Sequence, residues 1–250
     1  QTSFISIAKG DVDQRHWFRL VRPLAAAYGL RGLVSWSGTM FEYLMPLLIM
    51  RDYPNTLLHE TYEFVLKSQI EYGRMRRTPW GVSESGYNAF DLNMNYQYRA
   101  FGVPGLGLKR GLARDVVIAP YAAVLGLLVD PVRAMENIRE MEKENLEGEF
   151  GLYEAIDYTP ERVPRGKRSA VIKSYMAHHH GMSLLSIDNV INSFPMQERF
   201  HRSPIVKSAE LLLQEKVPER GVIGSAAGDE LSPCRGIERD HEIRPRVVKA

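Results

Sequence analysis

Apolar positions recur at helical spacing in the first half of the chain. Residues 55–74 place their apolar side chains on one face of a helix, at Leu58, Tyr62, Val65, Leu66 and Ile70. Charged residues occupy another face, so this segment is predicted to be an amphipathic helix with Asn55 as its N-cap. Residues 39–51 are almost wholly apolar and predict a buried helix that is kinked at Pro46. We expect the two segments to form a helical hairpin.

The same alternation of a buried and an amphipathic segment returns further along the chain. Residues 115–129 are mostly apolar, and residues 130–145 begin with a capping aspartate, Asp130, followed by Pro131 in the first turn. Their apolar stripe consists of Val132, Met135, Ile138 and Met141. Further helices are expected over residues 171–191, 195–201 and 204–214. Because strand-like alternation is nearly absent, the sequence predicts an all-α protein.

Inner helices paired with outer helices predict an (α/α) toroid whose connecting loops form a cleft. The longest predicted loops are residues 75–114 and 147–167, and loops beyond ~15 residues in compact domains are usually functional or disordered. The first loop carries too many aromatic rings for a solvated linker: Trp80, Tyr87, Phe90, Tyr96, Tyr98 and Phe101. We therefore expect a functional site in these loops.

Composition narrows the classes of partner. The 250 residues are 44% hydrophobic and 25% charged, which is typical of a globular protein. The net charge of +2 gives no broad field for nucleic acid or an anionic membrane surface. A single cysteine, Cys234, excludes an internal disulfide and a cysteine-rich zinc site. No apolar run is long enough for a membrane helix, so we expect a soluble segment, and one that begins inside a larger protein because it has neither an initiator methionine nor a signal peptide.

One carboxylate stands between two serines in the stretch "WGVSESGY", residues 80–87. An acid that donates a proton near neutral pH needs a pKa of roughly 6 to 7, and the apolar rings of Trp80 and Tyr87 could raise the pKa of Glu84 toward that value. Rings that stack on sugars and short polar side chains that bond their hydroxyls are the mixture that a glycan cleft needs. Alternatively, Glu84 caps a helix or accepts backbone N–H groups, and the spacing alone does not decide.

Other titratable residues leave two interpretations open. Glu42 lies on an apolar helix and forms either a structural salt bridge or part of a site. Glu154 and Asp157, in "GLYEAIDYTPER", fit a cleft and a capping role equally. The histidines of "AHHHGM", residues 177–182, point about 100° apart along a helix, so no two share a face as metal ligands would. A hydrogen-bonded histidine is therefore favoured over a metal site, and no phosphate-binding loop or other cofactor motif is found.

Several long stretches resemble one known family. They are "SWSGTMFEYLMPLLIMRDYPNTLL", "PWGVSESGYNAFDLNMNYQYRAFGVPGLGLKRGL", "VIAPYAAVLGLLVDP", "GLYEAIDYTPERV" and "MAHHHGMSLLSIDNVI". Together they resemble the glycoamylase-like middle domain of bacterial cyclic β-1,2-glucan synthases, over roughly residues 3–218. The resemblance implies an (α/α)6 barrel that closes linear β-1,2-glucan into rings by anomer-retaining transglycosylation. It also implies a parent protein at the cytoplasmic face of the bacterial inner membrane, with a glucosyltransferase part and a phosphorylase-like part as partners.

The resemblance assigns roles to individual residues. The acid of "SES" falls on Glu84, as the general acid/base, whereas the family's nucleophile falls before residue 1. Residues 1–218 would then be the C-terminal part of the barrel, and residues 219–250 a linker or the start of the next domain. The expected sugar platforms are Trp36, Trp80, Tyr87, Tyr96 and Tyr98. The expected polar contacts are Glu42, Asp91, Glu154 and His179, with no metal.

Two other functions remain open at this stage. One is a hydrolase of the endo-β-1,2-glucanase kind, whose inverting carboxyl groups would lie ~6.5 to 9.5 Å apart rather than ~5 to 5.5 Å. The other is a glycan-binding or structural module without turnover. A partial barrel is also expected to be inactive alone and to expose the inner-helix residues Leu44, Leu48, Val124 and Leu128, which would promote association.

Overall fold

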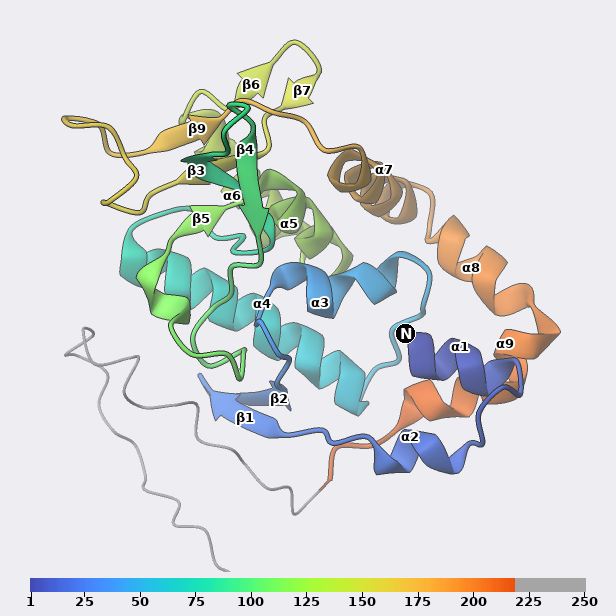
Figure 1. Cartoon of the computed structure of the whole chain (residues 1–250). Helices are drawn as coiled ribbons and strands as arrows, with labels where there is room; N and C mark the ends of the chain where they lie inside the picture. The colour runs from blue at the N-terminus through green and yellow to red at the C-terminus, as the bar shows by residue number, and fades with distance from the viewer. Residues whose placement is uncertain (219–250) are drawn as a thin grey trace, which may run out of the picture.

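A computed structural model describes residues 1–218 of the chain, so the predicted linker at 219–250 lies outside the described residues. The long helix α4, Leu57–Arg76, crosses the molecule, and the hairpin of β1 (Leu24–Ala27) and β2 (Leu30–Leu33) lies beside it (Figure 1). The short helix α3, Met40–Leu44, occupies the centre of the same view. No helix in the described part of the chain is long and apolar enough to cross a membrane.

The first predicted helical pair is confirmed, with shifted ends. The apolar segment forms α3 and then a 3-10 turn, Met45–Leu48, that contains Pro46 near its start. The amphipathic helix α4 begins at Leu57, and its N-cap is Thr56, whose hydroxyl accepts the N–H of His59. Asn55 has a positive φ of 61° and lies in the turn before the cap, which is a backbone conformation that asparagine tolerates.

The second pair follows the sequence pattern closely. Helix α5, Pro120–Leu125, continues into a 3-10 turn at Gly126–Leu128, and α6 spans Pro131–Glu142. Asp130 caps α6 by accepting the N–H of Arg133 at 3.0 Å. Helix α5 contacts both α6 and α7, Ala177–Ile191.

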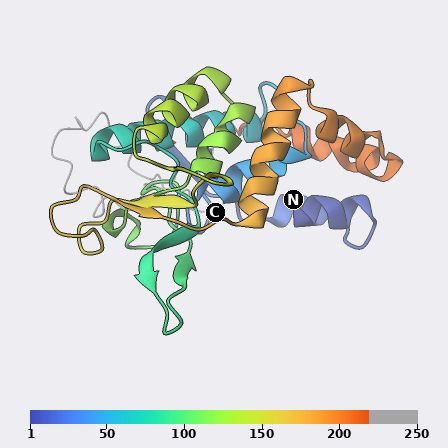
Figure 2. The same ribbon diagram turned by 90° about the horizontal axis from the view of Figure 1, so that it is seen from above.

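The prediction of an all-α protein was wrong in the connecting segments. The described residues contain four small sheets, of two or three antiparallel strands each. One pairs β3 (Ser85–Phe90) with β4 (Tyr96–Arg99), and this hairpin projects from the body of the protein (Figure 2). A three-stranded sheet has the order β5 (Val117–Ile118), β8 (Ala155–Asp157) and β9 (Ala170–Ile172), with β8 in the middle. A further hairpin pairs β6 (Glu147–Gly148) with β7 (Gly151–Leu152). Most of these strands are too short to show an alternating pattern. The helix predicted over residues 171–191 begins only at Ala177, because residues 170–172 form β9.

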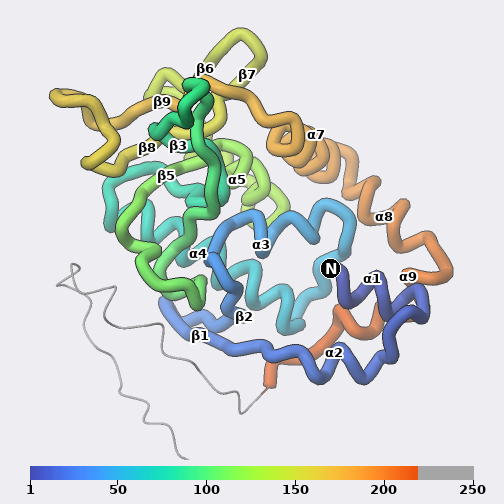
Figure 3. Tube along the Cα trace, in the orientation of Figure 1, coloured from blue at the N-terminus to red at the C-terminus, as the bar shows by residue number. Residues whose placement is uncertain are grey.

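The two ends of the described chain meet. Helix α1, Thr2–Ala8, contacts α9, Pro204–Ala209, and the tube in Figure 3 shows the blue and orange segments side by side. The other elements here are α2 (Arg15–Arg19), α8 (Pro195–Arg202) and the 3-10 helix η4 (Glu210–Gln214), whereas the 3-10 helix η2 (Leu112–Arg114) lies between β4 and β5. A small core of Phe4, Trp17, Met50, Val206 and Leu213 joins these segments.

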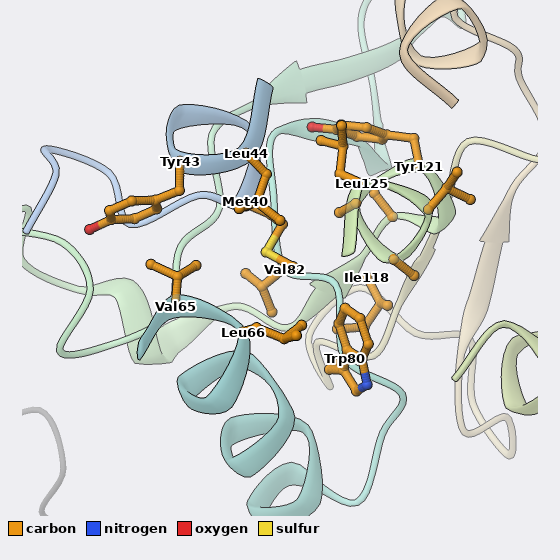
Figure 4. Packing of buried hydrophobic residues seen from close by; sticks show 14 of the residues in the cluster. Met40, Tyr43, Leu44, Val65, Leu66, Trp80, Val82, Ile118, Tyr121 and Leu125 are labelled. Carbon is orange, nitrogen blue, oxygen red and sulfur yellow. The ribbon is translucent and has the colours of Figure 1, made fainter. Parts of the chain in front are cut away.

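The main core lies between α3, α4 and α5 (Figure 4). Leu44, Leu48 and Val124 are only 0%, 5% and 7% exposed, and Leu128 packs partly buried against the same core, so the prediction that these residues face solvent was wrong. Neighbouring helices of the same chain already cover them. Apolar exposure is instead found on α7, at Leu184 and Ile191, which are 69% and 73% exposed.

Replacing Gly126 with alanine is expected to destabilise this core. An added Cβ would lie 2.7 Å from Cη2 of Trp80, whose side chain is itself buried. Overpacking of this kind costs about 1–3 kcal/mol in the free energy of unfolding, which urea denaturation measures. Gly181→Ala in α7 is the matched control, because nothing lies within 4 Å of its added Cβ, and it should be neutral or stabilising by up to about 1 kcal/mol. Equal effects at the two glycines would contradict the packing argument.

Candidate active site

Hydrogen bonds hold the backbone on both sides of Glu84. Ser83 and Ser85 are fully buried, whereas Glu84 between them is partly exposed. The Ser83 hydroxyl accepts the N–H of Phe41 at 3.0 Å, which ties the segment to the first turn of α3. The Tyr121 hydroxyl lies 2.7 Å from Ser83 Oγ and 3.0 Å from the carbonyl oxygen of Glu84, to which it can donate. The backbone that carries the Glu84 side chain is therefore held in place.

Burial raises the pKa of Glu84, which is the direction that a proton donor near neutral pH needs. A positive charge on the neighbouring His179 would oppose this shift, and the negative charge of Glu42 adds to it, so Glu42 acts on the Glu84 carboxyl. Within residues 1–218 no hydrogen bond reaches that carboxyl, and the alternative in which Glu84 accepts backbone N–H groups finds no donor there. Its oxygens are open to an incoming group.

A buried acid and a buried histidine lie beside Glu84. Glu154 and His179 are 4% and 1% exposed, and Glu154 Oε2 lies 2.9 Å from Nδ1 of His179. The second oxygen, Oε1, accepts the N–H of Gly86 at 3.1 Å, so this carboxylate also fixes the start of β3. The imidazole stacks on the ring of Tyr121, with centroids 3.7 Å apart and planes 13° from parallel. This confirms the expectation of a hydrogen-bonded histidine, and no group of His, Cys, Asp or Glu in the described residues is arranged to hold a metal ion.

Tyr98 reaches the surface from the same cluster. Its hydroxyl lies 3.3 Å from Nε2 of His179 and 3.5 Å from Nε2 of His178, and its side chain is 39% exposed. Burial raises the pKa of Tyr98, and the charges of Glu84 and Glu154 raise it further. Tyr98 is therefore a polar group near Glu84 that a ligand can reach.

Two other expected polar contacts are already occupied. Glu42 closes a capping box with Thr39 and also accepts the hydroxyl of Ser35 at 2.7 Å. It is exposed, and it forms no salt bridge with the residues that the structure describes. Asp91 lies at the tip of the β3–β4 hairpin, where its Oδ1 accepts the N–H groups of Asn93 and Asn95 at 2.8 and 2.9 Å. These backbone hydrogen bonds lower the pKa of Asp91.

The expected sugar platforms differ in availability. Trp36 is 66% exposed, but Trp80 is 7% exposed, and its backbone N–H and C=O pair with the side-chain amide of Asn137. The structure thus places Trp80 in the core, where its ring is unavailable for stacking on sugar. The rings of Tyr96 and Phe90 pack against each other in a tilted arrangement, with centroids 4.6 Å apart and planes 35° from parallel.

Tyr87 belongs to a group of contacts that the sequence did not reveal. The edge of Phe101 lies against it, and the guanidinium carbons of Arg99 and Arg162 lie 5.3 and 5.0 Å from its ring centroid. Arg162 in turn donates to the fully buried Asp157, with Nε 2.6 Å from Oδ2. Asp157 also accepts the N–H of Asn88, a residue of β3, at 3.1 Å. Asp157 and Arg162 therefore anchor the hairpin that carries Tyr98.

A groove of about 380 Å³ opens on the other side of His179. It runs between α5, the β6–β7 hairpin and α7, and its lining is mostly apolar. Glu154 and His179 border it, together with Phe150, Leu184 and Ile187. His179 therefore borders this groove and also contacts the Tyr98 hydroxyl.

Comparison with known proteins relates this arrangement to carbohydrate-active proteins. Residues 5–204 match the model of the glycoamylase family, described as "Putative glucoamylase". Over 217 residues the chain is 48% identical to the cyclic β-(1,2)-glucan synthase NdvB of Rhizobium meliloti. The matched region covers 87% of this chain and only 8% of that protein.

Solved structures share the fold at low sequence identity. A Bacteroides uniformis protein described as a putative glucoamylase has a TM-score of 0.52 at 20% identity, over 75% of this chain and 44% of that one. A β-1,2-glucanase from Parabacteroides distasonis has a TM-score of 0.53 at 20% identity, over 76% of this chain and 26% of that one. These likenesses show a helical fold of the glycoside-hydrolase kind, and the chain spans less than half of either structure.

Proposed function

The chain belongs to the glycoamylase family, and from this premise we propose that it forms the part of a cyclic β-1,2-glucan synthase that closes linear β-1,2-glucan into rings. The proposal includes an (α/α)6 barrel for the whole domain, of which residues 1–218 supply one part. The observation that carries it is the state of Glu84: a partly exposed carboxyl with a raised pKa and no hydrogen-bond partner among the described residues. The names of the relatives supply the substrate class.

The proposed reaction is a double displacement. A carboxylate attacks the anomeric carbon while Glu84 protonates the departing glycosidic oxygen, which gives a glycosyl ester and a free chain end. Glu84, now ionised, then takes the proton from the 2-hydroxyl at the far end of the same glucan chain as that oxygen attacks the anomeric carbon and releases the ester. The product is a ring with retained configuration.

The attacking carboxylate is proposed to come from outside this chain. Glu154 is held by Gly86 and His179, and Asp157 is held by Arg162. Glu42 accepts several N–H and O–H groups in its capping box. The carboxylates near Glu84 that the structure describes thus have structural partners, which supports a nucleophile from another segment.

Product analysis tests the proposal. Linear β-1,2-glucan is incubated with the protein that carries this chain, and mass spectrometry detects rings by their mass, one water below that of the linear chain. Rings with retained configuration are expected. Linear fragments with inverted reducing ends would instead show a hydrolase, and binding without turnover would show a glycan-holding module.

The pH dependence of turnover should depend on Glu42. Protonated Glu84 is the donor in the first step, so the rate should fall as the pH rises through its raised pKa. The charge of Glu42 contributes to that raised pKa, and Glu42→Gln removes the charge while glutamine still closes a capping box. The alkaline limb of the kcat/KM profile is expected to move to lower pH in this variant. A limb that stays in place would show that Glu42 does not act on the titrating group.

A further inference from the structure

Glu154 and His179 have no direct role in the proposed function, and the inference about them rests on that function. They are 4% and 1% exposed, so a sugar has almost no access to either. Both nevertheless contact groups beside Glu84. Glu154 accepts the N–H of Gly86, two residues after Glu84, and His179 lies within 3.3 Å of the Tyr98 hydroxyl.

The strand register brings Tyr98 to the same place. Gly86 in β3 is the cross-strand partner of Tyr98 in β4, so the residue that Glu154 holds is paired with the residue that His179 contacts. Glu154, His179 and the β3–β4 hairpin are therefore linked to one another by hydrogen bonds around the Tyr98 hydroxyl.

With a neutral imidazole at His179, the hydrogen bonds set the direction in which the Tyr98 proton points. A carboxylate only accepts, so Nδ1 of His179 must carry the hydrogen that lies between it and Glu154 at 2.9 Å. The neutral ring then has its lone pair on Nε2, which faces the Tyr98 oxygen. The single hydroxyl proton of Tyr98 is directed to Nε2, and His178, at 3.5 Å, is the more distant acceptor. The oxygen of Tyr98 keeps its lone pairs for another donor.

We propose that Glu154 and His179 are positioning residues that make the Tyr98 hydroxyl a hydrogen-bond acceptor for a sugar hydroxyl at Glu84. The reacting hydroxyl gives its proton to Glu84, so the group that donates to Tyr98 is a hydroxyl vicinal to it on the same sugar. This contact orients the incoming ring for attack. It assigns the site a preference for acceptors that carry a free vicinal hydroxyl.

Glu154→Gln reverses this arrangement without removing a side chain. The amide oxygen can still accept the N–H of Gly86, and the amide nitrogen donates to Nδ1 of His179. The ring must then carry its hydrogen on Nε2 and donate it to Tyr98, which occupies an acceptor position of that oxygen and turns the Tyr98 proton away from Nε2. In the full protein that carries this chain, kcat for ring formation is expected to fall about tenfold, which corresponds to the loss of one such hydrogen bond. KM should stay within about twofold, because the rest of the sugar-binding surface is unchanged.

A double-mutant cycle separates this role from a structural one. Tyr98→Phe should lower kcat by about the same factor, and Glu154→Gln should have no further effect in the Tyr98→Phe background. Glu147→Gln, an exposed acid on β6, is the matched control and should leave kcat unchanged. The cycle thus asks whether Glu154 acts through the Tyr98 hydroxyl.

Additive losses in the double variant, or wild-type kcat in either single variant, would overturn the inference. If Glu154→Gln unfolds, Tyr98→Phe decides alone, because Tyr98 is 39% exposed, so its substitution should leave the fold intact, and the loss of its hydroxyl must still lower kcat about tenfold. A wild-type protein that does not act on β-1,2-glucan would overturn the proposed function together with this inference. If the wild-type protein forms rings and Tyr98→Phe forms them at the same rate, only the inference is overturned and the proposed function stands.

Discussion

Replacing Glu84 with glutamine is expected to slow β-1,2-glucan ring formation by about 10²- to 10⁴-fold, the usual contribution of general acid–base catalysis. The amide is nearly isosteric with the acid, and Ser83 and Ser85 on either side are fully buried, so the backbone should keep its position. An amide cannot donate a proton to the departing oxygen as an acid does. Ring formation is measured by mass spectrometry of the products from linear β-1,2-glucan.

Binding and a matched control complete that test. Glucan affinity should be unchanged in Glu84→Gln, because the substitution removes a proton donor and keeps the shape of the side chain. Glu149→Gln alters an exposed acid in the turn between β6 and β7 and should keep full activity. Near wild-type turnover in Glu84→Gln would remove Glu84 from the acid role and leave the "SES" segment as a structural turn.

Helical periodicity made part of the fold predictable. The capping residue Asp130 of α6 is a local feature and was confirmed, whereas Val132 and Met135 of its predicted apolar stripe are 68% and 42% exposed. The apolar face of α4 was likewise predicted from the spacing of its apolar residues, and the structure buries Tyr62, Val65 and Leu66 of that face. The strands were missed because segments as short as Val117–Ile118 show no periodicity, and their pairing with Ala155–Asp157 depends on contacts far along the chain.

The site was predictable only where chemistry is local. An acid between serines in an aromatic-rich loop pointed to Glu84, and burial does raise its pKa. The sequence does not show which aromatic ring faces solvent, because Trp36 and Trp80 both lie beside small residues in predicted loops or their edges but have opposite exposure. The contact between Tyr98 and His179 joins residues 81 positions apart, and no local pattern encodes it. Tyr121 was missed as well, although a tyrosine within an apolar helix signals a buried hydroxyl that needs a partner.

Arg162→Met should produce the largest loss of stability among the substitutions considered. The fully buried carboxylate of Asp157 receives two hydrogen bonds from this guanidinium, at 2.6 and 3.1 Å, and Asp115 contacts the same group. Methionine fills much of the same volume but leaves a buried charge without a cation, which costs about 3–5 kcal/mol. Urea denaturation followed by circular dichroism measures this free energy of unfolding.

Arg168→Met is the matched control for that change. Arg168 is 66% exposed and its nearest acid, Glu144, lies 4.0 Å away, so the loss should stay below about 1 kcal/mol. Adding Asp157→Asn to Arg162→Met removes the unpaired charge, and the double variant should be more stable than Arg162→Met alone. Because Asp157 also accepts the N–H of Asn88 in β3, the single variant should loosen the hairpin that carries Tyr98 and lower kcat as well. Equal losses for Arg162→Met and Arg168→Met would show that this pair contributes no more than a surface contact, and the anchoring of the hairpin would have to come from elsewhere.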